Sequence, residues 1–131
     1  MAESFRILSV EDDEGLYKLL QVTLRPLPVV LSHAKTGTEA LAMIPQVNPH
    51  LLILDITLPD MRGWQVLDQM SVDKTILKGV IVLTGRTETT HRVIARLQEV
   101  TAYVTKPFKP AELRRMVQEI VEKTAVTMAS H

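Results

Sequence analysis

The chain has 131 residues, of which 15 are basic and 15 acidic, so its formal net charge is zero. Apolar residues make up 46% of the chain, which is typical of one folded domain and too apolar for intrinsic disorder. Cysteine is absent from the sequence, which excludes disulfides, thiol nucleophiles and zinc–thiolate sites. The longest apolar run, residues 40–44, is far shorter than the roughly 20 residues of a membrane-spanning helix.

Five short apolar runs predict the strands of a sheet, because most of their residues are β-branched or leucine. The runs are residues 6–10, 29–31, 51–54, 80–83 and 102–104. The third and fourth runs are apolar throughout, which is typical of central strands that are covered on both faces.

A helical spacing of apolar residues predicts a helix after each of these runs. The residues that carry the spacing are Leu16, Leu19, Leu20, Thr23 and Leu24; Ala40, Leu41 and Ile44; Trp64, Leu67 and Met70; Val93, Ile94 and Leu97; and Leu113, Met116, Val117, Ile120 and Val121. Asp13 is the expected cap of the first helix, and residues 36–39 form a capping-box pattern for the second. Pro45 is expected to end the second helix, and Pro110 fits the first position of the fifth.

Strands that alternate with helices predict an α/β fold, in which a doubly wound parallel sheet carries helices on both faces. The sequence contains no repeat, linker or low-complexity segment. We therefore expect one domain over residues 5–124, with an N-terminal tail at 1–4 and a C-terminal tail at 125–131.

Polar side chains follow four of the five predicted strands. Glu11 and Asp12 follow the first, Asp55 the third, Thr84 the fourth and Lys106 the fifth. Ligands of open parallel sheets bind beyond the carboxyl ends of the strands, so these groups are expected to meet at one edge. A single Asp after a strand, taken alone, is more often a turn residue than a site, and Thr84 or Lys106 alone fits a helix cap or a solvated loop.

Three carboxylates that meet at one edge need a positive partner. They repel one another by roughly 4 kcal/mol per pair at about 4 Å and an effective dielectric near 20. Ligands that offer only oxygen suit a hard divalent cation, with Mg²⁺ first, and Lys106 adds one further positive charge. Carboxylates, Mg²⁺, a lysine and a hydroxyl are the equipment for phosphoryl transfer to an aspartate.

These residues stand in a series of motifs with a recognisable order. The motifs are Glu11 with Asp12, Asp55 within residues 52–60, Gly63 eight residues beyond Asp55, Thr84 with Gly85, and residues 103–108. Together they resemble the receiver domain of two-component response regulators, and the resemblance covers residues 5–124. It implies a flavodoxin-like (βα)5 fold with five parallel strands in the order 2-1-3-4-5.

The resemblance also implies roles at the metal site. Asp55 is similar to the family's phosphoacceptor. Asp12 is similar to the acid that binds Mg²⁺ (or Mn²⁺) directly, and Glu11 to the acid that acts mainly through water. The backbone carbonyl of Thr57 is implied as the third protein ligand.

A second set of implied roles concerns the response to phosphorylation. Thr84 resembles the switch hydroxyl that bonds the phosphoryl group, and Lys106 resembles the lysine that pairs with a phosphoryl oxygen. The bond between Lys106 and Pro107 is expected to be cis. Tyr103 resembles the switch aromatic, which turns inward when Thr84 moves.

The implied partners are proteins. A sensor histidine kinase or a phosphotransfer protein is the expected donor, and a downstream protein or a second copy is expected on the face made by the fourth helix, fifth strand and fifth helix. Its basic residues are Arg92, Arg96, Lys109, Arg114 and Arg115. The neutral charge argues against DNA binding by this chain, and no membrane contact is expected. Residues 1–6 lack a signal-peptide pattern, so we expect a cytoplasmic location.

Other functions remain open at this point. The main alternative is a receiver fold used only for phosphorylation-independent docking, and the full set of acids, Thr84 and Lys106 argues against it. The chain is expected to be either a stand-alone receiver or a fragment of a larger regulator or hybrid kinase. A dehalogenase-type phosphatase needs a second Asp where Thr57 stands. A nucleotide-binding fold needs a Gly-x-Gly-x-x-Gly motif or a Gly-Lys-Ser/Thr loop, and the sequence contains neither. We expect no enzyme activity beyond self-catalysed phosphotransfer and autodephosphorylation.

Overall fold

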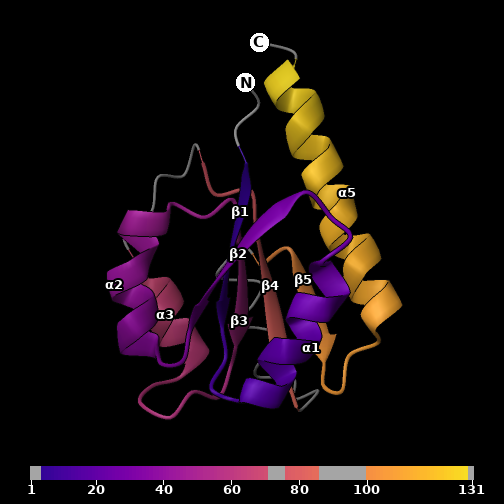
Figure 1. Ribbon diagram of the computed structural model, residues 1–131. Helices are drawn as coiled ribbons and strands as arrows, with labels where there is room; N and C mark the ends of the chain where they lie inside the picture. Colours follow the sequence, from indigo (N-terminus) through magenta and orange to yellow (C-terminus); the bar gives the residue numbers. More distant parts are fainter. Residues whose placement is uncertain (1–3, 71–75, 86–99, 130–131) are drawn as a thin grey trace.

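The computed structural model describes residues 4–70, 76–85 and 100–129 (Figure 1). Within them, strands and helices alternate as β1 (Phe5–Val10), α1 (Glu14–Leu24), β2 (Val29–Ala34), α2 (Gly37–Val47), β3 (Leu51–Asp55), α3 (Gly63–Gln69), β4 (Gly79–Thr84), β5 (Ala102–Thr105) and α5 (Pro110–Ala129). The helix predicted around Val93, Ile94 and Leu97 lies outside the described residues.

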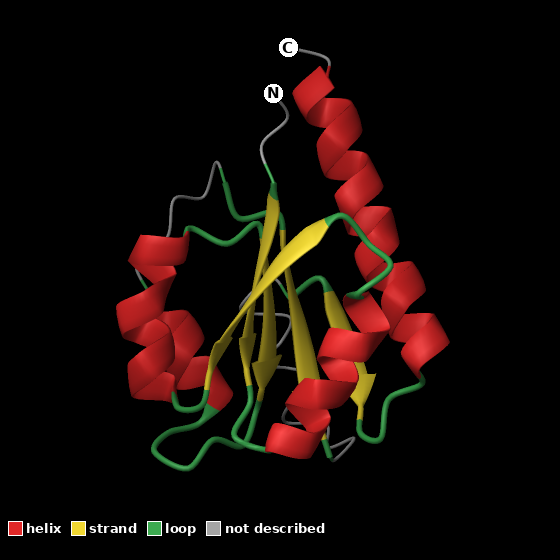
Figure 2. Ribbon diagram, viewed as in Figure 1, coloured by secondary structure: helices red, strands yellow, loops and turns green. Residues whose placement is uncertain are grey.

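The strands form one parallel sheet in the order β2-β1-β3-β4-β5, as predicted. Every residue of β3 and β4 is buried, which confirms that these two runs are central strands covered on both faces. All five strands run in one direction, so their carboxyl ends share one edge of the sheet (Figure 2).

Helices cover both faces of the sheet (Figures 1 and 2). One apolar core joins α2 and α3 to the sheet, and a second core joins α1 and α5 to the opposite face. A hydrogen bond ties the latter pair of helices together, because Arg114 Nε donates to the carbonyl oxygen of Thr23 at 2.8 Å. This is the doubly wound architecture that the strand and helix order predicted.

The start of α1 follows its local signal. Asp13 Oδ1 accepts the backbone N–H of Leu16 at 3.1 Å, which confirms the predicted cap. The core-facing side is narrower than predicted, because Leu20 and Leu24 are buried whereas Leu19 is 39% exposed. Leu19 lies beside the core-facing positions on the helix surface, where no neighbouring element in the described residues buries it.

The end of α2 differs from the prediction. Thr36 Oγ1 accepts the N–H of Glu39 as expected, but Pro45 lies inside the helix, which ends at Val47. Asn48 adopts a left-handed conformation with φ of 48° and donates its N–H to Ile44. A proline removes only its own N–H and crowds one carbonyl, so this close to the end the last turn survives with another residue as its cap.

The last helix begins as predicted and ends later. Pro110 is its first residue, and the helix continues to Ala129 through residues 125–129, which were expected to be a tail. The sequence after Pro110 contains no further proline and no glycine, so nothing in its composition stops the helix at 124. The structure reveals no helix, among the residues it describes, that is long and apolar enough to span a membrane.

Candidate functional site

The ends of β1 and β3 bring three carboxylates together at the carboxyl edge of the sheet. Glu11 and Asp12 follow β1, and Asp55 is the last residue of β3. One carboxylate oxygen from each of the three lies within 4.8 Å of the others. Glu11 and Asp55 are buried and Asp12 is exposed, so the group opens to solvent on the side of Asp12.

Lys106 provides the positive partner that the sequence called for. Its Nζ lies 2.7 Å from Asp55 Oδ2 and 3.1 Å from Glu11 Oε2. The backbone N–H of Lys106 donates to the carbonyl oxygen of Thr84 at 2.6 Å, which fixes the start of this connection beside β4. The bond between Lys106 and Pro107 is cis, as expected.

Burial and mutual repulsion raise the cost of charge in this group. Burial first, and then a hydrogen bond and the charge of Asp55, raise the pKa of Glu11 to about 7. Burial alone would lower the pKa of Lys106, but its hydrogen bond to Asp55 and the two carboxylate charges outweigh burial and raise that pKa. Lys106 is therefore charged at neutral pH, and Glu11 and Asp55 share its single positive charge.

The two expected switch residues lie on neighbouring strands. Thr84 is buried at the end of β4, one residue beyond Leu83, which is in register with Asp55. Tyr103 lies on β5, in register with Val82 of β4, and its half-buried side chain packs against the core under α2 and α3. Thr84 therefore lies on the strand next to Asp55, and Tyr103 lies one strand further along the sheet.

Thr57 lies in the loop after β3, and Gly63 is the first residue of α3, where this loop ends. The N–H of Thr57 donates to Asp55 Oδ1 at 2.9 Å, so this loop already holds one oxygen of the central carboxylate. Gly63 donates its N–H to Ile56 at 2.7 Å, and a Cβ at position 63 would lie 2.6 Å from the carbonyl oxygen of Asp55. Only glycine allows this close approach of backbone to backbone.

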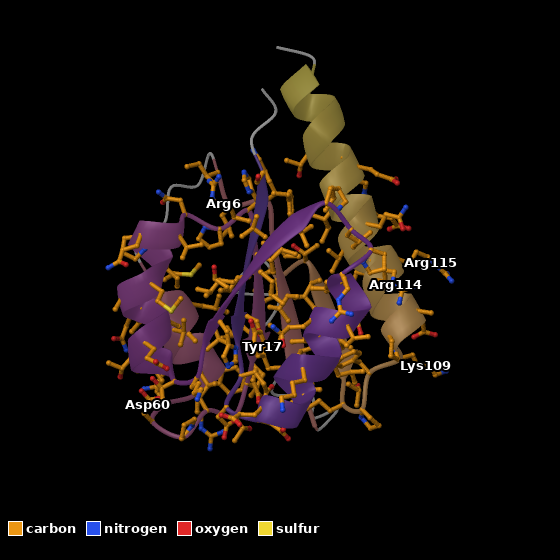
Figure 3. All side chains as sticks on the ribbon, viewed as in Figure 1. Arg6, Tyr17, Asp60, Lys109, Arg114 and Arg115 are labelled. Carbon is orange, nitrogen blue, oxygen red and sulfur yellow. The ribbon has the colours of Figure 1, made fainter. Side chains whose placement is uncertain are left out.

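Sequence reasoning missed one contact of this loop. Asp60 lies beside the start of α2 (Figure 3), where its carboxylate accepts hydrogen bonds from the N–H groups of Gly37 and Thr38 and from the Thr38 hydroxyl. A Pro–Asp pair in a loop signals a turn, but nothing in the sequence says which helix the side chain reaches.

The basic residues of the expected docking face have different surroundings. Arg114 and Arg115 lie in the first part of α5, and Lys109 directly precedes that helix (Figure 3). Arg114 is engaged with Thr23 of α1, whereas Lys109 and Arg115 are exposed. Arg92 and Arg96 lie outside the described residues.

His33, which the sequence left without a role, stacks on Tyr17 of α1 with ring centroids 3.7 Å apart. Burial lowers the pKa of His33, and the nearby charge of Lys35 lowers it further. The ring is therefore neutral and structural in character at neutral pH.

Comparison with known proteins gives the same family. The family model described as the response regulator receiver domain matches residues 7–118. The receiver domain of a putative LuxO repressor protein from Vibrio parahaemolyticus has a TM-score of 0.86 and 27% sequence identity, with 98% of each chain covered.

Two curated relatives are regulators longer than this chain. The DNA-binding response regulator MtrA of Mycobacterium tuberculosis (strain ATCC 25618 / H37Rv) is 34% identical over 108 residues, which are 82% of this chain and 46% of MtrA. The alkaline phosphatase synthesis transcriptional regulatory protein PhoP of Bacillus subtilis (strain 168) is 30% identical over 125 residues, 95% of this chain and 52% of PhoP. The chain thus spans about half the length of these relatives, and it belongs to the response regulator receiver domain family.

Proposed function

We propose that this chain is the phosphoacceptor of a two-component phosphorelay. Asp55 takes a phosphoryl group from a sensor histidine kinase or a phosphotransfer protein, with Mg²⁺ or Mn²⁺ bound beside it. The observation that carries the proposal is the 2.7 Å contact between Asp55 Oδ2 and Lys106 Nζ inside a group of three carboxylates. Membership of the receiver family supports it.

The reaction needs little covalent machinery. One oxygen of the Asp55 carboxylate attacks the phosphorus, the P–N bond of the donor phosphohistidine breaks, and its electron pair stays with the imidazole, which takes up a proton. The product is an acyl phosphate. Asp55 is held for this step at both oxygens, by Thr57 N–H and by Lys106, and Lys106 can follow the negative charge onto the phosphoryl oxygens.

The residues at the edge fit a hard divalent cation. The three carboxylates offer only oxygen, and their atoms lie within 4.8 Å of one another. We assign Asp12 as a direct ligand, Glu11 as a ligand through water, and the Thr57 carbonyl as the third protein group. When bound, the cation supplies positive charge beside the transferred phosphoryl group.

Thr84 and Tyr103 transmit the change in this proposal. The Thr84 hydroxyl bonds the phosphoryl group, and Tyr103 fills the space that the β4 end vacates. Shifting a two-state element from mostly off to mostly on takes about 5.5 kcal/mol, and charge-assisted hydrogen bonds of about 1.5–3 kcal/mol each are of the right size. Amide NMR shifts on adding beryllofluoride, a phosphoryl mimic, test the coupling: Thr84→Ala should bind the mimic with much smaller shifts around Tyr103, and wild-type shifts in that variant count against it.

The output face of this proposal is the surface of β5 and α5 together with the helix expected around 93–97. A groove of about 320 Å³ between β5 and α5, lined in part by Tyr103, Lys109 and Met116, supports contact with a protein surface. We propose that a downstream protein or a second copy binds here, that this chain itself binds neither DNA nor membranes, and that it acts in the cytoplasm. Sedimentation with and without beryllofluoride tests self-association.

Intact-mass spectrometry tests the phosphoacceptor assignment. Incubation with acetyl phosphate and Mg²⁺ should add one phosphoryl group to the wild-type chain, and none after chelation of the metal. Asp55→Asn, which keeps the shape but not the nucleophilic oxygen, is the matched control. Equal labelling of Asp55→Asn overturns the assignment, and no labelling of the wild type favours a docking module that does not depend on phosphorylation.

A further inference from the structure

The loop after β3 is a closed turn, and Thr57, whose carbonyl is an assigned ligand, lies at its base. Thr57 pairs with Arg62 in a short antiparallel bridge, and the N–H of Leu58 donates to Met61 at 3.3 Å. The base of the turn therefore carries Thr57, whereas Asp60 stands at its tip. Because these contacts close the turn, a contact that fixes the tip also fixes the position of the base.

The tip is attached to a different element. Asp60 Oδ1 accepts the N–H of Gly37 at 2.8 Å, and Asp60 Oδ2 accepts the N–H and the hydroxyl of Thr38 at 2.9 and 2.6 Å. The Thr38 hydroxyl first, and then the two backbone N–H groups, lower the pKa of Asp60 to about 2. The carboxylate thus satisfies two of the unpaired N–H groups at the start of α2 and is fully charged at neutral pH.

A second contact fits the turn against the same helix. Gly37, the first residue of α2, lies under the side chain of Met61, and a Cβ at position 37 would overlap Met61 Cγ and Sδ. The glycine therefore lets the loop lie directly on the helix end. Polar and apolar contacts both fix the turn at one place.

The residue pair before α2 is in turn tied to α2 itself and to the start of α1. Lys35 donates its N–H to Glu39 of α2 and its Nζ to Glu14, the first residue of α1, at 3.1 Å. Residues 35–38 carry none of the assigned ligands, yet they contact Asp60 in the loop after β3 and Glu14, which follows the acidic connection after β1. The ion pair between Lys35 and Glu14 is exposed and weak, so the contact through Asp60 is the stronger of the two.

We propose that Asp60 is a positioning residue for the metal site, and that its contacts with Gly37 and Thr38 hold the loop so that the Thr57 carbonyl faces the carboxylates. This inference rests on the proposed function and deepens it. Mg²⁺ requires ligand oxygens at about 2.0–2.1 Å in near-octahedral geometry, so a small displacement of one ligand weakens binding. Loss of groups that orient ligands commonly costs about 10–100-fold in metal affinity.

The test compares two ways of weakening the start of α2. Asp60→Ala removes the contacts between loop and helix, whereas Thr36→Ala removes the bond to Glu39 N–H and leaves Asp60 in place. Mg²⁺ titrations of the full chain, followed by amide NMR where every variant is folded, should give a Kd raised about tenfold in Asp60→Ala. The Kd of Thr36→Ala should stay within about twofold of the wild type.

A conservative variant adds a graded readout. Asp60→Asn keeps one acceptor oxygen and loses the charge, so its Kd should lie between those of the wild type and Asp60→Ala, and it serves in place of Asp60→Ala should that variant not fold. Wild-type affinity in Asp60→Asn and Asp60→Ala overturns the inference, as does an equal loss in Thr36→Ala. A wild-type chain that binds no Mg²⁺ overturns the proposed function itself. A loss of affinity in one variant alone leaves the proposed function standing.

Discussion

The middle of the sheet and its carboxyl edge are stabilised by opposite means. Strands β3 and β4 are buried along their whole length and pack apolar side chains against both helical layers. At the edge where they end, three carboxylates lie within 4.8 Å of one another, and Lys106 pairs with two of them. The apolar middle provides enough stability for the fold to keep a charged edge that is unfavourable by itself.

Because of this contrast, substitutions a few residues apart should differ in their effects on stability and on the response to Mg²⁺. A change in the middle of a strand removes packing and should leave the response to Mg²⁺ intact. A change at the edge should alter that response, and its effect on the metal-free fold depends on which sign of charge is removed. The following predictions separate these cases.

The largest effect is expected in the middle of β3. Leu52 is 1% exposed, so Leu52→Ala should lower the free energy of unfolding by about 2–5 kcal/mol through lost burial and a residual cavity. Urea unfolding with and without Mg²⁺ measures it. The increment that Mg²⁺ adds to stability should be unchanged, and a lost increment would show that middle and edge are not separate.

Removal of the lysine should destabilise the edge. Lys106→Met leaves Glu11 and Asp55 buried without their positive partner, and with a quarter of the lysine exposed we expect a loss of about 1–3 kcal/mol without metal. Added Mg²⁺ should recover part of this loss, because it supplies positive charge at the same group. A variant as stable as the wild type without metal would mean that the carboxylates do not need compensation.

Removal of an exposed carboxylate should act in the opposite direction. Asp12→Ala relieves repulsion within the group, so the metal-free chain should gain up to about 1 kcal/mol of stability, while stabilisation by Mg²⁺ should fall. Thermal melts with and without Mg²⁺ measure both quantities, and Asp13→Ala, which removes only the cap of α1, is the control. Full Mg²⁺ stabilisation in Asp12→Ala would remove this residue from the site.

The smallest effect concerns pH. The pKa of Asp60 is lowered from 3.8 to about 2, so the folded state binds this proton more weakly than the unfolded state does. Its contribution to stability is fully present above about pH 4 and is lost as pH falls toward 2. The difference in unfolding free energy between wild type and Asp60→Asn should shrink across that window, and a difference that stays constant would show that the charge of Asp60 is not involved.

The features predicted from sequence are those with local or periodic causes. The buried runs of β3 and β4, the cap at Asp13 and the helix start at Pro110 each follow from neighbouring residues. The convergence of Glu11 and Asp55 with Lys106 was also predictable, because parallel strands deliver their ends to one edge.

The features that were missed depend on tertiary packing. Leu19 matches the helical spacing but meets no covering element in the described structure, and the proline at 45 is tolerated because Asn48 caps the last turn. Asp60 reaches a helix that precedes it by more than 20 residues, and no local signal specifies that partner. Contacts of this kind are fixed only when the elements have packed.

The most direct test of the account locates the phosphoryl group. After incubation with acetyl phosphate and Mg²⁺, borohydride reduction converts an aspartyl phosphate to homoserine, which peptide mass spectrometry can place. We predict homoserine at Asp55 alone, dependent on Mg²⁺ and on Lys106. Homoserine at Asp12 or Asp13, or at Asp55 to the same extent after removal of the metal, would contradict the account.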